Sequence, residues 1–411
     1  MTQLPKEFTE YTRRLMGGER FERYLQSFEQ EAPVSIRLNP RVASTWTVSE
    51  GEHVHWCHDG FYLPFRPNFT FDPLFHAGCY YVQEAASMFL SHILATHLPA
   101  DKPVDALDLC AAPGGKSTLL CASLPQGSVL YSNEPVRQRA SILAENMQKW
   151  AYGHCIVTNN YPRDYRKSKL KFDLILCDVP CSGEGMFRKD AATVGEWSLQ
   201  NVARCQQLQR DIVADAWECL NDGGLLVYST CTFNTKENEE NIRWILSAYD
   251  AELLCVDTKA EWNITGSLLE GFDAPVYRFI PGITRSEGLF MCAIRKAPGS
   301  TQRPANSGKR TGTRDADKHL SVLLTTSPSP IAPPSSPTAE LNFQQAIAYL
   351  RHEAIVLPPE TPRGIVTVTF MGEPLGTVKN IGTRANNLYP KEWKIRTTHI
   401  PQDYEAILTH A

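Results

Sequence analysis

The spacing of hydrophobic residues changes three times along the chain, and each change separates two predicted regions. From residue 8 to residue 28 they recur every three or four positions, which is the period of amphipathic helices. From 104 to about 296, short apolar runs alternate with helical patterns. Residues 298–338 are dominated by Pro, Ser, Thr and Gly and are expected to form a linker. The last segment, 339–411, combines one helical pattern with strand-like runs and predicts a small appended module.

The alternating region, assigned to 101–297, predicts an α/β fold. Strand-like runs occupy 106–110, 129–133, 155–158, 172–177, 225–230, 253–256 and 289–294. Helical patterns occupy 117–123, 137–150, 198–220 and 236–249. This alternation indicates a mostly parallel, Rossmann-like sheet of seven strands with helices on both faces. Ligands of such sheets bind over the carboxyl ends of the strands.

The first 100 residues are expected to form a separate α+β region. Two helical patterns precede a short strand at 33–40, and a further helix is expected to end near His97. Between them, 56–75 is rich in aromatic residues and turns. This stretch either stacks on nucleic-acid bases or, as is commoner, covers the surface of the neighbouring domain.

Composition limits the classes of function. The 411 residues are 42% hydrophobic and 21% charged, which suffices for buried cores. The net charge of -4 gives no overall attraction to polyanions, so a nucleic acid would need a local basic patch. The 12 cysteines include no Cys-x-x-Cys pair, so reduced thiols and no metal site are predicted. No signal peptide and no apolar run of about 18 residues are found, which predicts a cytoplasmic protein without a membrane span.

The turn after the first strand of the α/β region has the sequence of a cofactor cradle. A strand-like run from Val104 ends in small residues at 111–115, and helix-like sequence starts at Lys116. A strand that turns through glycine into a helix directs free backbone N–H groups at a ligand. The phosphate-loop consensus requires glycine where Cys110 stands, and Pro113 interrupts the loop, so a nucleoside triphosphatase is the weaker interpretation. The Gly-x-Gly-x-x-Gly dinucleotide pattern is absent.

A carboxylate ends the second strand of this region. Glu134 follows Asn133 and can accept hydrogen bonds from both hydroxyls of a ribose, as acidic residues do at this position of related folds. A solvated turn residue before Pro135 is the alternative. Together with the glycine turn, Glu134 favours a nucleoside cofactor that has no pyrophosphate.

Two cysteines follow neighbouring strands. Asp178, Pro180 and Cys181 come directly after the buried run 172–177, and Cys231 follows 225–230. Because the carboxyl ends of parallel strands meet at one edge of a sheet, we expect the two thiols to lie at the same edge. A single strand-end cysteine is more often a small buried hydrophobe. Two cysteines beside an aspartate favour a thiol nucleophile.

These segments resemble the RNA cytosine-C5 methyltransferases, the RsmB/NSUN group. The resemblance covers nearly the whole chain and rests on Asp108-Leu109-Cys110-Ala111-Ala112-Pro113-Gly114-Gly115-Lys116, Asp178-Val179-Pro180-Cys181-Ser182-Gly183 and Ser229-Thr230-Cys231-Thr232. Residues 183–190, the upstream Tyr81-Val82-Gln83-Glu84 and the appended module look like the bacterial RsmF type, which modifies a cytosine of small-subunit ribosomal RNA. This implies a Rossmann-like S-adenosylmethionine-dependent methyltransferase sheet, an amino-terminal RNA-binding or capping region and a PUA-like RNA-binding module.

The resemblance also implies roles for individual residues. Cys231 would attack C6 of the cytosine, Asp178 would sit beside the base and the methionine moiety, and Cys181 would help to release the product. Arg188 and Lys189 would contact RNA phosphate. No metal is implied, and the protein is expected to act as a monomer on ribosomal RNA or the small ribosomal subunit. The cofactor S-adenosyl-L-methionine would be held by Asp178, Glu134, Asn160 and the turn residues Cys110, Ala111, Ala112, Pro113, Gly114, Gly115 and Lys116.

The chain departs from the family at two positions. Many relatives place an aspartate near the adenine after the third strand; here Asn160 is favoured for that contact and Asp164 is the alternative. Gly282 stands where relatives often carry histidine, so this position is not expected to be essential.

Two questions stay open on sequence alone. A non-catalytic RNA-binding or ribosome-assembly protein on the same fold is the main rival, and the presence of both cysteines argues against it. A further basic group is either an RNA surface or a solvated face, and it consists of Arg163, Arg166, Lys167, Lys169 and Lys171.

Overall fold

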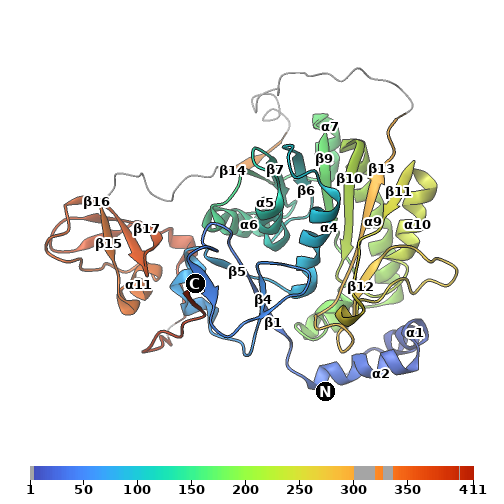
Figure 1. Cartoon of the computed structure of the whole chain (residues 1–411), viewed down its shortest axis with the longest axis horizontal. Coiled ribbons are helices and arrows are strands. Elements are labelled where there is room, and N and C mark those ends of the chain that lie inside the picture. The colour runs from blue at the N-terminus through green and yellow to red at the C-terminus, as the bar shows by residue number, and fades with distance from the viewer. Residues whose placement is uncertain (1–3, 300–319, 327–336, 398) are drawn as a thin grey trace.

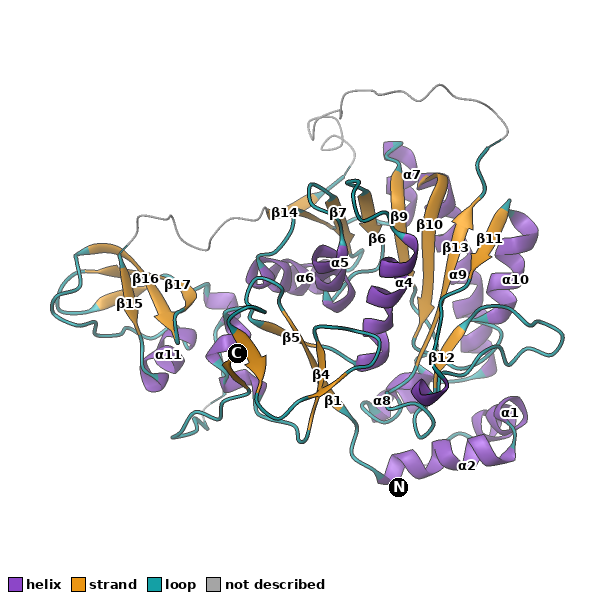
Figure 2. Ribbon diagram, viewed as in Figure 1, coloured by secondary structure: helices purple, strands orange, loops and turns teal. Residues whose placement is uncertain are grey.

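The computed structural model describes residues 4–299, 320–326, 337–397 and 399–411. A large sheet with helices on both faces forms the centre of the α/β region, hereafter the catalytic region (Figure 1). The amino-terminal sheet lies beside it, and the carboxyl-terminal module packs on the far side of that sheet (Figure 2). Among these described residues, no helix is both long and apolar enough to cross a bilayer.

The central sheet has nine strands, and the prediction of a mostly parallel α/β sheet is confirmed. Its order is β11-β13-β10-β9-β6-β7-β8-β14, with β12 paired to β13. The core strands β8, β7, β6, β9 and β10 run parallel, and β13 is antiparallel to its neighbours. All seven predicted strands form, and β12 and β14 are additional. Their bounds are β6 Asp105–Asp108, β7 Val129–Asn133, β8 Cys155–Thr158, β9 Phe172–Asp178, β10 Leu220–Thr230, β11 Ala251–Leu254, β12 Tyr277–Phe279, β13 Leu289–Lys296 and β14 Val322–Thr326.

Both faces of this sheet are buried, which explains why its strands read as continuous apolar runs. Along β9, Leu174 and Leu176 join one hydrophobic core, and Ile175 and Cys177 join the other. The first core is closed by α4 Phe89–His97, α5 Gly115–Ser123 and α6 Arg137–Trp150. The second is closed by α7 Pro162–Ser168, α9 Leu199–Cys219 and α10 Glu239–Ala248.

Part of the predicted linker belongs to the catalytic sheet instead. The sequence predicted a linker over 298–338, but β14 pairs antiparallel with β8, with Val322 opposite Thr158 and Thr326 opposite Cys155. Since an unpaired β8 would present free N–H and C=O groups at the sheet edge, β14 covers this edge. The Pro-rich remainder of the predicted linker lies outside the described residues.

The amino-terminal region combines the helices α1 and α2 and the short helix α3 with a four-stranded antiparallel sheet of order β3-β4-β1-β5. Most of its aromatic stretch packs inward: Phe61, Phe69 and Phe71 are buried, whereas Phe65 is 49% exposed. The elements are α1 Lys6–Met16, α2 Gly18–Gln26, β1 Val34–Leu38, β2 Trp46–Val48, β3 Glu52–His53, β4 Gly60–Leu63, α3 Pro73–His76 and β5 Tyr80–Val82.

The carboxyl-terminal module shares a hydrophobic core with this amino-terminal sheet. Ile36 and Phe71 belong to the same cluster as Ile347 and Val366. The last strand leaves the module and pairs with β2, and Glu373 accepts hydrogen bonds from Arg41 and Trp46, each at 2.9 Å. The module is therefore docked by packing. Its elements are β15 Thr338–Glu340, α11 Phe343–Leu350, β16 Gly364–Phe370, β17 Glu373–Asn380, β18 Ala385–Asn387 and β19 Leu408–His410.

Candidate active site

The glycine turn joins β6 to α5 at the carboxyl edge of the sheet. The backbone N–H of Ala111 donates to the carbonyl of Asn133 at 2.8 Å, which fixes the turn against the end of β7. Gly114 has φ +116°, a left-handed conformation that favours glycine. A Cβ on Gly115 would lie 3.3 Å from Cε1 of Tyr81. The turn is therefore closely packed against Tyr81, and the first N–H groups of α5 have no intrahelical partner.

A buried carboxyl group forms the floor of this turn. Asp108 is fully buried, and its Oδ2 accepts a hydrogen bond from Ser117 Oγ at 2.7 Å. Its Oδ1 has no hydrogen-bond partner among the described residues. Burial raises the pKa of Asp108 to about 7. The floor thus keeps one unused acceptor, which fits a cradle built for a polar ligand.

Glu134 is buried at the end of β7, so it is not the solvated turn residue that the sequence left as an alternative. Its Oε1 accepts from the Val136 N–H at 3.0 Å, and its Oε2 lies 3.5 Å from Arg139 Nη1. Arg139 Nη2 also donates to the carbonyl of Ala112 at 2.9 Å. Arg139 therefore ties the carboxylate to the glycine turn, a role that sequence reasoning missed.

The two candidates for the adenine contact have other partners in the structure. The Asn160 amide pairs with the backbone of Ser321, accepting at 2.9 Å and donating at 3.4 Å. Asp164 caps α7 by accepting from the Tyr161 N–H at 3.1 Å. Asn160 thereby extends the pairing of β8 with β14 by one side chain. Its amide is committed to the protein, which the sequence did not indicate.

Asp178 and Lys116 form an ion pair at the centre of the carboxyl edge. Lys116 Nζ donates to Asp178 Oδ2 at 2.8 Å, and the two side chains are 12% and 31% exposed. Burial acts to lower the pKa of Lys116, but the Asp178 carboxylate more than offsets it, so the pKa lies above its usual value.

The two predicted thiols meet at this edge. Cys181 Sγ lies 3.1 Å from Cys231 Sγ, within hydrogen-bonding distance, and both cysteines are free. The register explains the meeting, because Asp178 of β9 is the partner of Ser229 of β10, and each cysteine follows two or three residues later. The hydrogen bond to Cys231, and then burial, raise the pKa of Cys181 well above its usual value. Cys181 therefore keeps its proton, and either sulfur can be the donor in the contact between the two thiols.

A buried carboxylate fastens the loops that carry the two cysteines. Glu184 accepts hydrogen bonds from the backbone N–H groups of Phe233 and Asn234 at 2.6 and 3.0 Å. The Gly185 N–H donates to the Cys231 carbonyl at 2.7 Å. A Cβ on Gly185 would lie 2.8 Å from that carbonyl oxygen, so only glycine allows this approach. The two loops hence form one unit.

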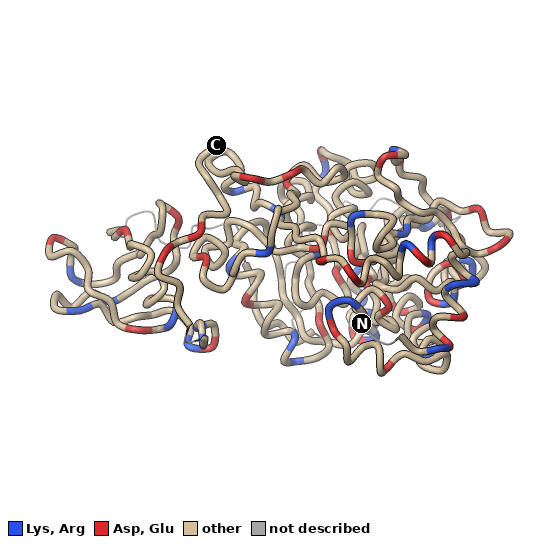
Figure 3. Tube along the Cα trace, turned by 90° about the horizontal axis from the view of Figure 1, so that it is seen from below, with Lys and Arg blue, Asp and Glu red and all other residues tan. Residues whose placement is uncertain are grey.

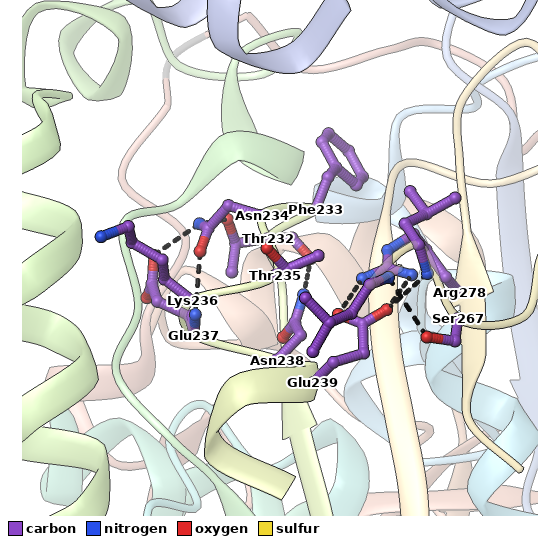
Figure 4. A network of polar contacts seen from close by, with 12 residues as sticks. Thr232, Phe233, Asn234, Thr235, Lys236, Glu237, Asn238, Glu239, Ser267 and Arg278 are labelled. Carbon is purple, nitrogen blue, oxygen red and sulfur yellow. Dashed lines mark hydrogen bonds and ion pairs between the residues drawn. The ribbon is translucent and has the colours of Figure 1, made fainter. Parts of the chain in front are cut away.

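The residues that follow Cys231 form a further set of polar contacts, and Figure 4 shows those from Thr232 to Glu239 with Arg278. Glu237 accepts from the Ser182 N–H at 3.0 Å, from Gln209 at 2.7 Å and from the Asn234 amide at 2.8 Å. Burial raises the pKa of Glu237 to about 7. Two residues further on, Glu239 forms a fully buried ion pair with Arg278, with N–O distances of 2.8 and 2.7 Å.

The amino-terminal helices cover both cysteine loops. The Phe8 ring contacts Phe187 with centroids 5.0 Å apart, and Tyr24 contacts Phe233 at 5.5 Å. Gly282, with φ +79°, lies against α2, and a Cβ at this position would overlap the carbonyl group of Arg23. The departure from histidine at Gly282 therefore has a packing reason, since any side chain would push α2 away from the site.

The basic residues predicted to bind RNA separate into three settings. Arg188 is 7% exposed and pairs with Glu287 at 2.7 Å, which does not fit a guanidinium free for phosphate. Lys189 is exposed. Lys169 and Lys171 precede β9 and so lie at the opposite end of that strand from Asp178. In the view of Figure 3, Lys and Arg positions are interspersed with Asp and Glu positions.

Sequence reasoning missed the residues that hold the site together. Glu184, Asn234 and Glu237 act through contacts between segments about 50 residues apart. One signal was available, because Glu184 lies inside the glycine-rich segment that follows Cys181. In the described part of the chain, no cluster of His, Cys, Asp or Glu is arranged to hold a metal ion.

A doubly wound sheet with a glycine turn after its first strand, an acidic residue after the second and paired functional groups at the carboxyl edge defines a Rossmann-like methyltransferase. Three family models match: 16S rRNA methyltransferase RsmB/F over residues 95–295, the N-terminal domain of 16S rRNA methyltransferase RsmF over 4–85, and the methyltransferase RsmF PUA domain over 336–395. The chain belongs to the RsmB/F family of 16S rRNA methyltransferases, which confirms the resemblance seen in its motifs.

Individual relatives agree with this assignment. Ribosomal RNA small subunit methyltransferase F of Pectobacterium atrosepticum is 31% identical over 330 residues, which cover 75% of this chain and 66% of the relative. The protein of that name from Cronobacter sakazakii is 26% identical, covering 95% and 96% of the two chains.

Solved structures show the same fold. A methyltransferase homologue from Pyrococcus horikoshii superposes with a TM-score of 0.57 and 26% identity, covering 71% of this chain and all of that one. NSun6 from the same organism, solved with SFG, gives a TM-score of 0.60 at 19% identity, covering 72% and 99%.

Proposed function

We propose that the protein transfers a methyl group from S-adenosylmethionine to C5 of a cytosine in RNA, and that the RNA is small-subunit ribosomal RNA. The observation that carries this proposal is the pair of free thiols 3.1 Å apart, Cys181 and Cys231. The names of the relatives support ribosomal RNA as the substrate.

The cradle fits the proposed cofactor. The turn Cys110–Lys116 offers backbone N–H groups, Asp108 keeps an unused acceptor, and the Glu134 carboxylate is suited to ribose hydroxyls. When bound, S-adenosylmethionine supplies an electrophilic methyl group. A structural relative solved with SFG, an analogue of this cofactor, supports the choice. Because its amide is paired with Ser321, Asn160 is assigned to holding β14.

Cys231 is the proposed nucleophile. C5 of cytosine is too weak a nucleophile to accept a methyl group unaided. When the Cys231 thiolate bonds to C6, the C5=C6 double bond is lost and C5 becomes enamine-like. A free thiol has a pKa of about 8.5, so the thiolate needs support. Cys181 Sγ, 3.1 Å from this sulfur, can donate a hydrogen bond to it, and Lys116 lies at the same edge of the sheet.

Product release reverses the addition of Cys231 to the cytosine. A proton acceptor removes the proton from the methylated C5, the C5=C6 double bond forms again, and the Cys231–C6 bond breaks. Cys181, whose sulfur is 3.1 Å from the departing sulfur, takes part in this half of the reaction. The Asp178 carboxylate accepts a hydrogen bond from the exocyclic N4 amine of the cytosine and keeps the base in position. Extruding the base from its stack costs a few kcal/mol.

The remaining assignments concern the partner. The exposed Lys189 contacts RNA phosphate beside the catalytic loop, and the PUA module binds RNA. We propose that a monomer acts on ribosomal RNA or the small subunit in the cytoplasm, where both cysteines stay reduced.

Separate Cys181→Ala and Cys231→Ala variants test the two-thiol assignment. The protein is incubated with S-adenosylmethionine and cytosine-containing small-subunit RNA, and adducts that survive denaturing gel electrophoresis are measured with methylation. We expect Cys181→Ala to accumulate a covalent adduct and Cys231→Ala to give neither adduct nor product. Cys255→Ala, which changes an exposed cysteine, is the control and should behave as wild type.

Other outcomes would overturn the assignment. If Cys231→Ala still methylates RNA, the nucleophile is another group, with Cys181 the next candidate. If wild-type protein binds RNA but methylates no cytosine, the alternative hypothesis holds, and the chain is a non-catalytic RNA-binding or ribosome-assembly protein.

A further inference from the structure

A groove of about 440 Å³ opens between the amino-terminal sheet and the catalytic region. Its walls come from 30–34, which leads into β1, from 63–66 after β4, and from 282–286 between β12 and β13. A volume of this size is in the range of about 300–1,000 Å³ found for sites that bind small organic groups.

One wall of the groove leads directly into the active site. Residues 282–286 continue into Glu287 and Gly288, whose carbonyl oxygens lie 3.2 and 2.9 Å from the position of a Cβ on Gly185. Gly185 belongs to the loop that holds Cys181 beside Cys231. Arg188, which also lines the groove, pairs with Glu287. The groove and the thiol pair thus share one packed backbone segment.

The groove displays an aromatic ring and cationic side chains. Phe65 is exposed, although most aromatic residues of the same stretch are buried in the cores. Arg66 beside it is exposed and has no carboxylate partner among the described residues. Arg285 lies across from them in an exposed ion pair with Glu52, a kind of pair that contributes little stability. Arg188 also lines the groove with Glu31, and because Arg188 and Arg285 are paired with Glu287 and Glu52, Arg66 is the lining cation that is left for a ligand.

The groove also contains an unused polar group. Ser286 lines it and is 2% exposed, and its hydroxyl has no hydrogen-bond partner among the described residues. A buried hydroxyl without a partner costs free energy unless a ligand or water supplies one. Bound RNA would supply phosphate, ribose and base acceptors.

We propose that this groove binds the single-stranded nucleotides next to the target cytosine, with one base stacked on Phe65 and a phosphate at Arg66. Aromatic rings beside cationic side chains are the usual composition of sites for single-stranded nucleic acid. The assignment rests on the proposed function for the identity of the target base. It adds the surface that holds the strand once that base has left its stack.

Separate Phe65→Ala and Arg66→Ala variants of the full chain test the proposal. Equilibrium binding of a fluorescent single-stranded RNA oligonucleotide is measured by anisotropy at several salt concentrations. Loss of a stacked base should weaken binding roughly 5- to 150-fold. Loss of a phosphate contact should lower the slope of log affinity against log salt by about 0.7. Phe65→Tyr keeps the stacking face and should restore affinity, whereas Phe65→Leu should not.

Matched controls come from the outer helices. Arg243 on α10 and Leu208 on α9 are exposed, and their alanine variants should bind RNA as wild type does. In methylation assays, Phe65→Ala should raise KM for RNA without changing kcat or KM for S-adenosylmethionine. Cross-linking with 4-thiouridine beside the target position should mark the peptide that contains Phe65.

The two proposals fail in different ways. If wild type methylates cytosine but Phe65→Ala and Arg66→Ala keep wild-type affinity and KM, the groove is not an RNA site. If wild type methylates nothing while the variants still lose RNA affinity, the groove stands and the proposed function falls. Loss of self-association in Phe65→Ala at unchanged RNA affinity would show that the groove binds a second copy, and would overturn the RNA assignment.

Discussion

Two ion pairs of the α/β region have nearly the same length and opposite settings. Lys116–Asp178 is 2.8 Å long with side chains 12% and 31% exposed, and Arg278–Glu239 is 2.7 Å long with both side chains fully buried. The first lies at the open carboxyl edge beside Cys231. The second lies behind the cysteine loop, where the Leu268 N–H also donates to Glu239 at 2.8 Å.

The difference teaches what each pair is suited to do. A fully buried pair satisfies its own charges and fixes the segments that carry them, but removing one partner leaves an uncompensated charge. A pair with one half-open carboxylate can exchange its contacts with a ligand. Arg278–Glu239 is accordingly a structural clamp, and Lys116–Asp178 is the pair whose charges remain accessible to a ligand.

Breaking the buried pair should have the largest effect on stability. Glu239→Ala leaves the Arg278 guanidinium buried without a counter-charge, and we expect a loss of about 3–5 kcal/mol in the free energy of unfolding. Denaturant titration followed by circular dichroism measures this loss. The double variant Glu239→Leu with Arg278→Met should recover most of it. Equal losses in the single and double variants would contradict the assignment of a clamp.

Breaking the open pair should instead reduce activity. Asp178→Asn keeps the shape and one acceptor for Lys116 but removes the charge at the base. We expect a fall of about 10²–10⁴-fold in methylation rate. Stability should fall by much less than in Glu239→Ala, because solvent reaches Asp178. A fall in stability as large as that of Glu239→Ala, with activity retained, would reverse the two roles.

Glu237 shows what a buried carboxyl does when its partners are neutral. Its pKa is raised from 4.5 to about 7, so the folded protein binds its proton more tightly than the unfolded chain. Between these values the native state holds more protons, and stability must fall as pH rises. The slope is at most about 1.4 kcal/mol per pH unit. Unfolding midpoints at pH 5 and pH 7.5 should differ less in Glu237→Gln than in wild type, and an unchanged difference would refute the assignment.

An exposed ion pair is expected to contribute least to the free energy of unfolding. Arg13 and Glu22 lie 2.9 Å apart with about half of each side chain exposed. Glu22→Ala should change the free energy of unfolding by less than about 1 kcal/mol, because water screens the charges. A larger change in thermal unfolding would show that short distance alone sets the strength of these pairs.

The features predicted from sequence are those encoded by local pattern. Period and turn chemistry gave the seven strands and the glycine turn. The strand ends placed Asp178, Cys181 and Cys231 at one edge, because parallel strands align their carboxyl ends. Motif identity supplied the family, which the family models confirm.

The features that sequence did not predict depend on partners far away in the chain. From sequence, Arg188 was expected to be a free cation, but in the structure it pairs with Glu287, 99 residues later. From sequence, Asn160 was favoured as a ligand contact, but in the structure its amide pairs with Ser321, 161 residues later. β14 lies in a segment with the composition of a linker, and it forms a strand by pairing with the edge strand β8. No local pattern contains this information.

The docking of the carboxyl-terminal module fixes its distance from the thiol pair, and this distance matters for any RNA that contacts both. A module on a flexible tether samples many positions, and the gain from a second binding site then depends on tether length. Here the shared core, the β19–β2 pairing and the contacts of Glu373 fix the module relative to the thiol pair. If the module binds RNA as proposed, an RNA gains avidity only when its module-binding element and its target base are separated by the distance between the module and the thiol pair.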